Sequence, residues 1–270
     1  MKAFSRKILI LIIILQSCDQ IFGQVDEAPK NPVPLPPVRE ADIMWSKRIW
    51  RVIDMREKIN LPFYYPTKPA NGLKSFMQMI LDALKDKQIT AYDASSDEFL
   101  IPLTYEQIMQ SLSQADTITI QRTEPPYDTY DTVITKDFDP TAVKQIRIKE
   151  DWFFDKQRSV MDVRILGICP ILEEYDDDGE FKGYKPLFWI YYPHARNVFV
   201  QNNVFNRFND SVRLTYDDIF LKRFFGSYIY KESNVYDRKI SEYAKGMDAL
   251  LESERIKNEI FILEHDLWEY

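Results

Sequence analysis

The sequence predicts an α+β fold of mixed strands and helices, arranged as two related lobes with a proline-rich N-terminal arm and a C-terminal helix. Three observations carry this prediction. Apolar residues recur with a helical period in some segments, aromatic and β-branched residues dominate others, and three short motifs occur twice in the same order. A chain of 270 residues can bury one large core or two small ones.

Residues 1–23 are predicted to be a secretory signal peptide. Three cations precede an apolar run over residues 8–15, which is too short to cross a bilayer. Cleavage after Gly23 would release a soluble, exported chain. The alternative is a lipoprotein box ending at Cys18, in which Gln16 fits poorly. Both routes stay open at this point.

The charge balance argues against nucleic-acid binding. The net charge is −7 at pH 7, and loss of residues 1–23 lowers it to −9 because three cations and one carboxylate leave.

Cys18 leaves with residues 1–23, so Cys169 has no partner for an intrachain disulfide. Cys169 lies in an apolar run, which predicts a buried core thiol.

The N-terminal part is expected to contain the arm, residues 24–41, and a first lobe, residues 42–117. The arm has five prolines and predicts an extended chain, either a passive tether or a strap laid on a neighbour. Within the lobe, residues 45–58 are predicted to form a helix, residues 61–66 a short strand, and residues 73–84 a second helix. The apolar residues that place the first helix on one face are Trp45, Ile49, Val52 and Ile53.

Residues 118–145 are predicted to be connecting strands, followed by a second lobe over residues 146–231. Strand-like stretches in this lobe cover 146–157, 159–172 and 184–193, with Asp178-Gly179 as the hairpin turn before the last. The final segment, residues 232–270, is predicted to be one long helix from Ile240. Its predicted apolar stripe consists of Ile240, Tyr243, Ala244, Met247, Leu250 and Leu251.

The repeated motifs suggest an internal duplication, and chance likeness is the alternative. The pairs are Val52–Arg56 with Val160–Arg164, Leu61–Pro66 with Phe188–Pro193, and Pro102–Met109 with Arg213–Phe220. In the third pair, Thr104 with Gln107 forms a capping-box motif, and Thr215 with Asp218 approximates one. In the first pair, the duplication would make Asp54–Arg56 and Asp162–Arg164 matching polar contacts within each lobe.

Candidate chemical sites are weak. Glu174, Asp176 and Asp178 alternate before a glycine as in a calcium loop, but Lys185 stands where the closing carboxylate belongs, so a solvated hairpin tip is predicted. His194 and His265, the two histidines, belong to no zinc spacing. Nucleophile-elbow, phosphate-loop and dinucleotide motifs are absent from the sequence. We therefore predict no catalytic, cofactor-binding or metal-ligating residue, no cofactor and no enzymatic activity.

Aromatic and arginine residues are instead predicted to form partner interfaces, since Trp, Tyr and Arg are the usual anchors there. The candidates are Trp45, Trp50, Arg51, Phe63, Tyr64, Tyr65, Trp189, Tyr191, Tyr192 and Trp268. The long C-terminal helix is a further candidate for docking on a neighbour. A rival interpretation is a periplasmic ligand- or carbohydrate-binding module that uses the same aromatic groups as stacking platforms.

The segment 41–66, "ADIMWSKRIWRVIDMREKINLPFYYP", together with "WFFDKQ" and "RILGICP", closely resembles the GldN/PorN family of gliding-motility and type IX secretion proteins of the Bacteroidetes. The resemblance extends over the predicted mature chain. It implies a non-enzymatic scaffold in the periplasm, at the inner face of the outer membrane. It also implies three partners: an outer-membrane lipoprotein of the GldK/PorK type, neighbouring copies in a ring, and the periplasmic part of a GldM/PorM-type motor protein. Cleavage after Gly23 fits this resemblance, because the lipoprotein supplies the anchor.

Overall fold

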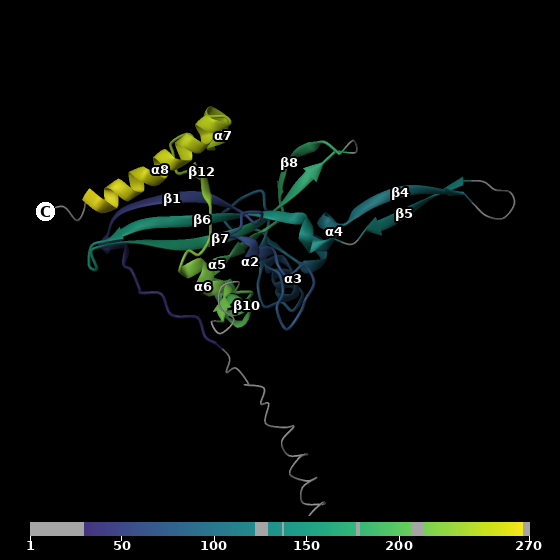
Figure 1. Ribbon diagram of the computed structural model, residues 1–270, viewed down its shortest axis with the longest axis horizontal. Helices are drawn as coiled ribbons and strands as arrows, with labels where there is room; N and C mark the ends of the chain where they lie inside the picture. The colour runs from purple at the N-terminus through teal and green to yellow at the C-terminus, as the bar shows by residue number, and fades with distance from the viewer. Residues whose placement is uncertain (1–29, 122–128, 137, 177–178, 207–212, 267–270) are drawn as a thin grey trace, which may run out of the picture. The chain divides into compact units, whose positions relative to one another are not determined.

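The computed structural model describes residues 30–121, 129–136, 138–176, 179–206 and 213–266. The predicted α+β class is confirmed, since helices and antiparallel sheets alternate and a helix ends the described chain (Figure 1). The predicted signal peptide and residues 122–128 of the predicted connecting strands lie outside the described residues. Within 32–270 the chain forms one compact unit.

The centre of this unit is an eight-stranded antiparallel sheet. Its strand order is β12-β1-β6-β7-β9-β2-β3, and β8 pairs with β7. The bounds are β1 Ile43–Asp54, β2 Ala91–Tyr92, β3 Pro102–Leu103, β6 Val143–Asp155, β7 Val160–Tyr175, β8 Phe181–Pro186, β9 Trp189–Tyr191 and β12 Tyr228–Glu232. Two hairpin pairs stand apart from it in the pairing: β4 Gln114–Gln121 with β5 Thr129–Lys136, and β10 Asn203–Val204 with β11 Leu214–Thr215.

The helices are mostly short. They are η1 Glu40–Asp42, α2 Leu61–Tyr64, α3 Phe76–Lys85, α4 Tyr105–Leu112, η2 Pro140–Ala142, α5 Tyr192–Gln201, α6 Tyr216–Leu221, α7 Ile240–Tyr243 and α8 Met247–Asp266. Figure 1 shows α2, α3, α5 and α6 close together, and α8 running beside β1 and β12.

The helix predicted over residues 45–58 is wrong, because Ile43–Asp54 is strand β1. It pairs with β6 along its length, for example Arg51 with Ile148 and Ile53 with Ile146. Side chains of a strand alternate between faces, so Ile49 and Ile53 point to one side while Val52 points to the other. All three are buried. A strand covered on both faces has a nearly continuous apolar sequence, which imitates the spacing of an amphipathic helix.

The strand predicted over residues 61–66 is also wrong, because Leu61–Tyr64 is the short helix α2. Pro62 occupies its first turn, where a missing N–H costs nothing. Asn60 fixes the start of this helix. Its amide nitrogen donates to the Gly226 carbonyl at 2.9 Å, and its amide oxygen accepts from the Gly226 N–H at 2.9 Å. Tertiary contacts therefore decide the conformation here.

Helix α3 confirms the second predicted helix, with a later start. The side chain of Ser75 caps it by accepting from the Gln78 N–H, and its apolar stripe is buried. Phe76 enters an aromatic cluster that joins α2, α3, α5 and α6. The members of this cluster are Phe63, Phe76, Tyr192, Phe199, Tyr216 and Phe220.

Both capping boxes are confirmed. Thr104 caps α4 with Gln107, and Thr215 caps α6 with Asp218; each helix follows a two-residue strand. The duplication itself is not confirmed. Residues 61–64 are helical, whereas 188–193 contain a strand that leads into α5, and strands from both predicted lobes share one sheet. The expected contacts in the first motif pair do occur, as Arg56 binds Asp54 and Arg164 lies 3.4 Å from Asp162.

The predicted strands of the central part occur as β4, β5, β6, β7, β8 and β9, except that residues 192–193 of the last stretch begin helix α5. The single C-terminal helix is instead divided into α7 and α8. The break includes Gly246, whose φ of 59° favours glycine. Helix α8 packs Ile256 and Ile260 against Ile229 of β12.

Candidate functional site

The structure buries half of the ten side chains predicted to form interfaces. Trp50, Arg51, Phe63, Trp189 and Tyr192 are buried, and Trp45, Tyr64 and Tyr191 are partly buried. Tyr65 is exposed, and Trp268 lies outside the described residues. In this conformation the five buried residues contact the core of their own chain, whereas the prediction expected them at a partner interface.

Trp50 illustrates why an aromatic residue of this stretch is buried. Its indole Nε1 donates to the Asp97 carboxylate at 2.6 Å, and the Lys231 ammonium lies 4.5 Å from the ring centroid. Trp50 forms a buried cluster with Cys169 and Trp189, and Phe99 packs against this cluster. The indole thus has both a hydrogen-bond partner and a cation over its ring, so its polar and π groups are already satisfied within the chain.

Arg51 points to the opposite face of the sheet, into a buried ionic network. Its Nε lies 3.3 Å from the carboxylate of Glu150, and burial lowers the pKa of Arg51. The same carboxylate accepts from Arg223 at 2.8 Å and from the Trp152 indole at 3.0 Å. Arg51 and Arg223 both also lie over the ring of Trp152. This network joins β1, β6 and the turn that follows α6.

A second ionic group holds the chain that precedes the sheet. Arg196 of α5 binds the Asp217 carboxylate of α6 through two nitrogens, at 2.9 and 3.0 Å. Its Nη2 also donates to the carbonyl of Val33 at 2.8 Å, and Arg164 donates to the carbonyl of Pro36 at 2.8 Å. Part of the predicted arm therefore lies on its own domain. Proline segments leave carbonyls unpaired, which suits arginine donors.

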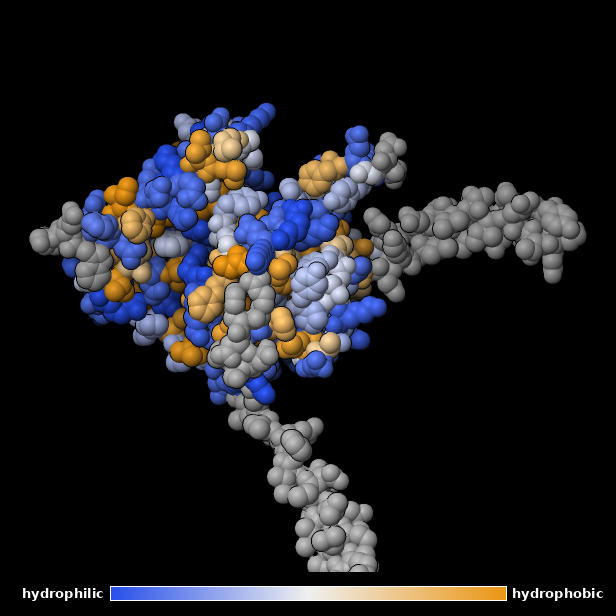
Figure 2. All heavy atoms as spheres, in the orientation of Figure 1, coloured by the Kyte–Doolittle hydropathy of each residue, from blue (hydrophilic) through white to orange (hydrophobic). Residues whose placement is uncertain are grey.

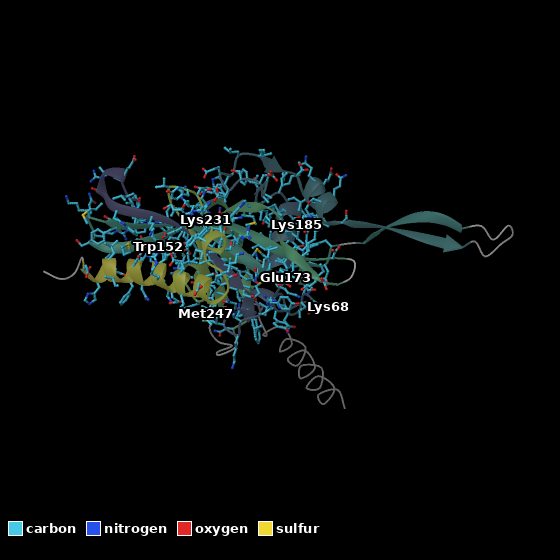
Figure 3. All side chains as sticks on the ribbon, turned by 90° about the horizontal axis from the view of Figure 1, so that it is seen from above. Lys68, Trp152, Glu173, Lys185, Lys231 and Met247 are labelled. Atoms are coloured by element: carbon cyan, nitrogen blue, oxygen red, sulfur yellow. The ribbon has the colours of Figure 1, made fainter. Side chains whose placement is uncertain are left out.

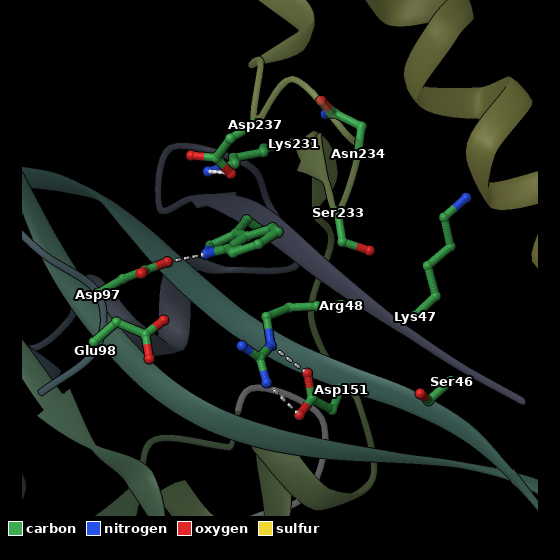
Figure 4. Close-up of a pocket in the computed structure, with 11 residues that line it drawn as sticks. Ser46, Lys47, Arg48, Asp97, Glu98, Asp151, Lys231, Ser233, Asn234 and Asp237 are labelled. Atoms are coloured by element: carbon green, nitrogen blue, oxygen red, sulfur yellow. Dashed lines mark hydrogen bonds and ion pairs between the residues drawn. The ribbon is translucent and has the colours of Figure 1, made fainter.

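A pocket of about 600 Å³ opens beside Trp50 (Figure 4). Its lining is mostly charged, and the charges form ion pairs with each other or with neighbouring residues. Arg48 binds Asp151 through two nitrogens at 2.7 and 3.0 Å, and Lys231 lies 2.6 Å from Asp237. Such a lining differs from the aromatic-walled pocket that a stacking carbohydrate site requires.

The structure reveals an exposed aromatic cluster that the sequence interpretation missed. Tyr175 at the end of β7 and Phe181 and Tyr184 on β8 are 53%, 51% and 44% exposed. Phe181 contacts both tyrosine rings, with centroid distances of 6.0 and 4.9 Å. We call these three residues the β8 aromatic cluster. Their position around the acidic run of the predicted hairpin was the sequence signal that could have indicated this cluster. Lys185 and Glu173, labelled in Figure 3, belong to the same pair of strands.

A second exposed surface is the outer side of α8. Met247, Leu250 and Leu251, part of the predicted apolar stripe, are 70%, 52% and 61% exposed. The side chains of α8 that face the sheet are Ser253, Ile256 and Ile260, beside Trp152 (Figure 3). Apolar and hydrophilic side chains mix on the surface in this region (Figure 2).

The chemical groups singled out in the sequence are dispersed in the structure. In the described parts of the chain, groups of three or more potential metal ligands do not occur. His194 and His265 are both exposed. Cys169 is fully buried, as predicted, and burial raises the pKa of its thiol to about 12. Asp178 of the acidic run lies outside the described residues.

Comparison with known proteins identifies the chain through a family. None of the helices in the described part of the chain is long and apolar enough to span a membrane. No curated protein sequence matches the chain. The model of the family described as "Gliding motility associated protein GldN" matches residues 38–269, a range that begins just before β1 and extends beyond α8. The chain therefore belongs to the GldN family of gliding motility associated proteins.

Proposed function

We propose that the chain is a non-enzymatic, periplasmic structural component of the type IX secretion and gliding machinery. In this proposal it forms a ring with an outer-membrane lipoprotein of the GldK/PorK type, and the ring couples to a GldM/PorM-type motor protein. The observation that carries the proposal is the family match over residues 38–269, which includes the whole central sheet. The signal-like segment 1–23 supports export to the periplasm.

The β8 aromatic cluster is our candidate contact for the lipoprotein. Strand β8 pairs only with β7 among the described strands, so one of its edges has backbone groups available for an added strand. Exposed Tyr and Phe side chains beside such an edge are typical anchors of a protein interface. The edge and the cluster together favour a protein ligand over a small molecule.

The rival function, a carbohydrate-binding module, has less support. It requires aromatic rings that are accessible in a pocket, whereas the predicted aromatic groups mostly pack in the core. The Trp50 indole beside the pocket already donates to Asp97. In the β8 aromatic cluster, the Phe181 ring meets its neighbours edge-on, at interplanar angles of 73° and 65°, so the rings do not form one flat platform.

Co-expression of residues 24–270 with the ring lipoprotein tests the proposal. We expect one large, ring-shaped particle in size-exclusion chromatography and electron microscopy. Phe181→Ser should reduce co-elution, whereas Leu100→Ser, which changes a 74% exposed residue between β2 and β3, should not. Separate elution of a folded chain and the lipoprotein would contradict the ring. Equal loss with both variants would contradict the assignment of the β8 aromatic cluster.

A further inference from the structure

Helix α8 carries apolar side chains on two opposite faces. One face is buried against the sheet through Ile256 and Ile260. Residues at the helical spacing i, i+3, i+4, i+7 form the other, which we call the outer face of α8. Its residues are Met247, Leu250, Leu251, Glu254, Asn258, Phe261, Ile262 and His265. Five of these are large apolar side chains between 52% and 70% exposed. A surface helix normally has its polar residues at such positions.

The apolar residues of the outer face form two clusters, one near each end of the helix. Leu250 and Leu251 belong to the first, Phe261 and Ile262 to the second, and Glu254 and Asn258 lie between them. At a rise of about 1.5 Å per residue, the clusters are about 16 Å apart. This symmetric arrangement of apolar, polar and apolar residues limits what can cover the whole face.

We infer that the outer face of α8 binds the same face of a second copy of this chain, with the two helices antiparallel. A two-fold axis near Ile256 places Leu250 opposite Ile262 of the second copy, and Leu251 opposite Phe261. Each apolar cluster thereby meets an apolar cluster. Between them, each Glu254 faces Asn258 of the second copy, whose amide can donate to the carboxylate. The contact is self-complementary, as a two-fold interface must be.

Electrostatics selects the antiparallel orientation over the parallel one. A parallel pair would also join like clusters, but it would bring the two Glu254 carboxylates together and align the helix dipoles. In the antiparallel pair the dipoles oppose each other, and the flank that carries Arg255 meets its counterpart. Arg255 binds Glu252 and Glu259 of its own helix. In each copy this flank therefore presents a cation together with carboxylates to the matching flank of the other copy.

This inference goes beyond the proposed function and does not require the lipoprotein. A ring closes through a heterologous contact between neighbours, whereas the α8 contact is isologous and joins copies in pairs. The β8 aromatic cluster belongs to a different part of the sheet and takes no part in it. Lipoprotein binding and α8 pairing can therefore succeed or fail independently.

Sedimentation of residues 24–270 over a range from about 1 to 100 µM tests the pairing. We expect a monomer–dimer equilibrium that Leu250→Ser with Phe261→Ser weakens about 100-fold or more, because all four apolar contacts across the two-fold axis lose one partner. The matched control is Leu100→Ser with Val235→Ser, which removes apolar residues elsewhere that are even more exposed. A wild-type chain that stays monomeric throughout, or a control that weakens the dimer equally, would overturn the inference.

Disulfide trapping tests the orientation. Oxidation of Leu250→Cys mixed with Ile262→Cys should give a mixed dimer. Leu250→Cys alone should not cross-link, because the two copies of position 250 would be twelve residues, or about 18 Å, apart along the helices. A disulfide allows a Cα separation of about 7 Å at most. Cys169 is buried and provides the internal control. Cross-linking of Leu250→Cys with itself would show a parallel pair and overturn the inference.

Discussion

The guanidinium of Arg223 donates to the carboxylate of Glu150 at 2.8 Å, where that carboxylate has no exposed surface. Arg51 approaches the same carboxylate from the neighbouring strand. The charges lie between two apolar clusters of the sheet, one beneath α8 and one beneath α3 and α6. The position of α6 relative to the strands therefore depends on an ionic contact as well as on packing.

Glu150→Gln should lower the free energy of unfolding by about 3–5 kcal/mol, because it leaves the buried guanidinium of Arg51 and the partly buried one of Arg223 without a counter-charge. Urea unfolding followed by circular dichroism measures the change. Glu174→Gln is the matched control, since Glu174 pairs with Lys185 at the surface and should change stability by about 0.5 kcal/mol or less. An effect of similar size in both variants would contradict the buried-network interpretation.

Gly167→Ala should destabilise the chain by about 1–3 kcal/mol. A methyl group at Gly167 would lie 2.5 Å from the ring of Phe99 and 3.2 Å from Trp189. Phe99 packs here with Trp50 and Cys169, so the strain falls on the cluster that covers this face of the sheet. Thermal unfolding measures the loss.

Gly183→Ala on β8 is the control for this change, because a methyl group there meets no atom within 4 Å. It should leave the unfolding temperature unchanged or slightly raise it, since alanine has less conformational freedom in the unfolded chain. A stable Gly167→Ala variant would mean that Phe99 can move away at little cost.

Short sequence motifs were sufficient to predict the elements whose conformation depends on neighbouring residues. The two capping boxes occur as expected, because Thr104 and Thr215 bind backbone groups only three residues away. The long strands β6 and β7 follow from their β-branched and aromatic content. These elements needed no knowledge of distant parts of the chain.

Tertiary contacts decide the elements that the sequence mispredicted. Strand β1 has buried residues on both faces, and its cation Arg51 is neutralised by Glu150 of another strand, which no local pattern reveals. The stripe around Met247 was extended across the break at Gly246, where the helical phase is lost. The burial of Trp50 could not be predicted from neighbouring residues either, because its indole binds Asp97, 47 residues further along the chain.

Asp54 should make the chain sensitive to acid. Burial acts to raise the pKa of Asp54, but hydrogen bonds from Arg56 and Gln145 outweigh it and hold the pKa below its usual value. A group whose pKa is lower in the folded state stabilises the fold above its unfolded pKa of about 3.9. That contribution is lost as the pH falls through the lower, folded value.

Asp54→Asn should therefore cost about 1 kcal/mol at pH 7, and the difference from the wild type should disappear as the pH falls through the lower, folded pKa of Asp54. Urea unfolding at a series of pH values measures both quantities. Arg56→Gln removes the main partner and should produce a similar loss, with little further effect in the double variant. A difference that persists unchanged at low pH would show that the contact with the charged carboxylate is not its source.

Cys169 should be unreactive until the chain unfolds. The thiol has no exposed surface, and burial raises its pKa to about 12, so the reactive thiolate is scarce at pH 8. In residues 24–270, a thiol reagent should label this cysteine only as urea exposes it, in step with the loss of circular dichroism. Leu100→Cys, which adds a thiol at an exposed position, should react at once in the folded chain. Rapid labelling of the unaltered chain in the absence of urea would mean that the sheet opens around Cys169 under native conditions, and that the packing of Trp50, Trp189 and Phe99 over it is transient.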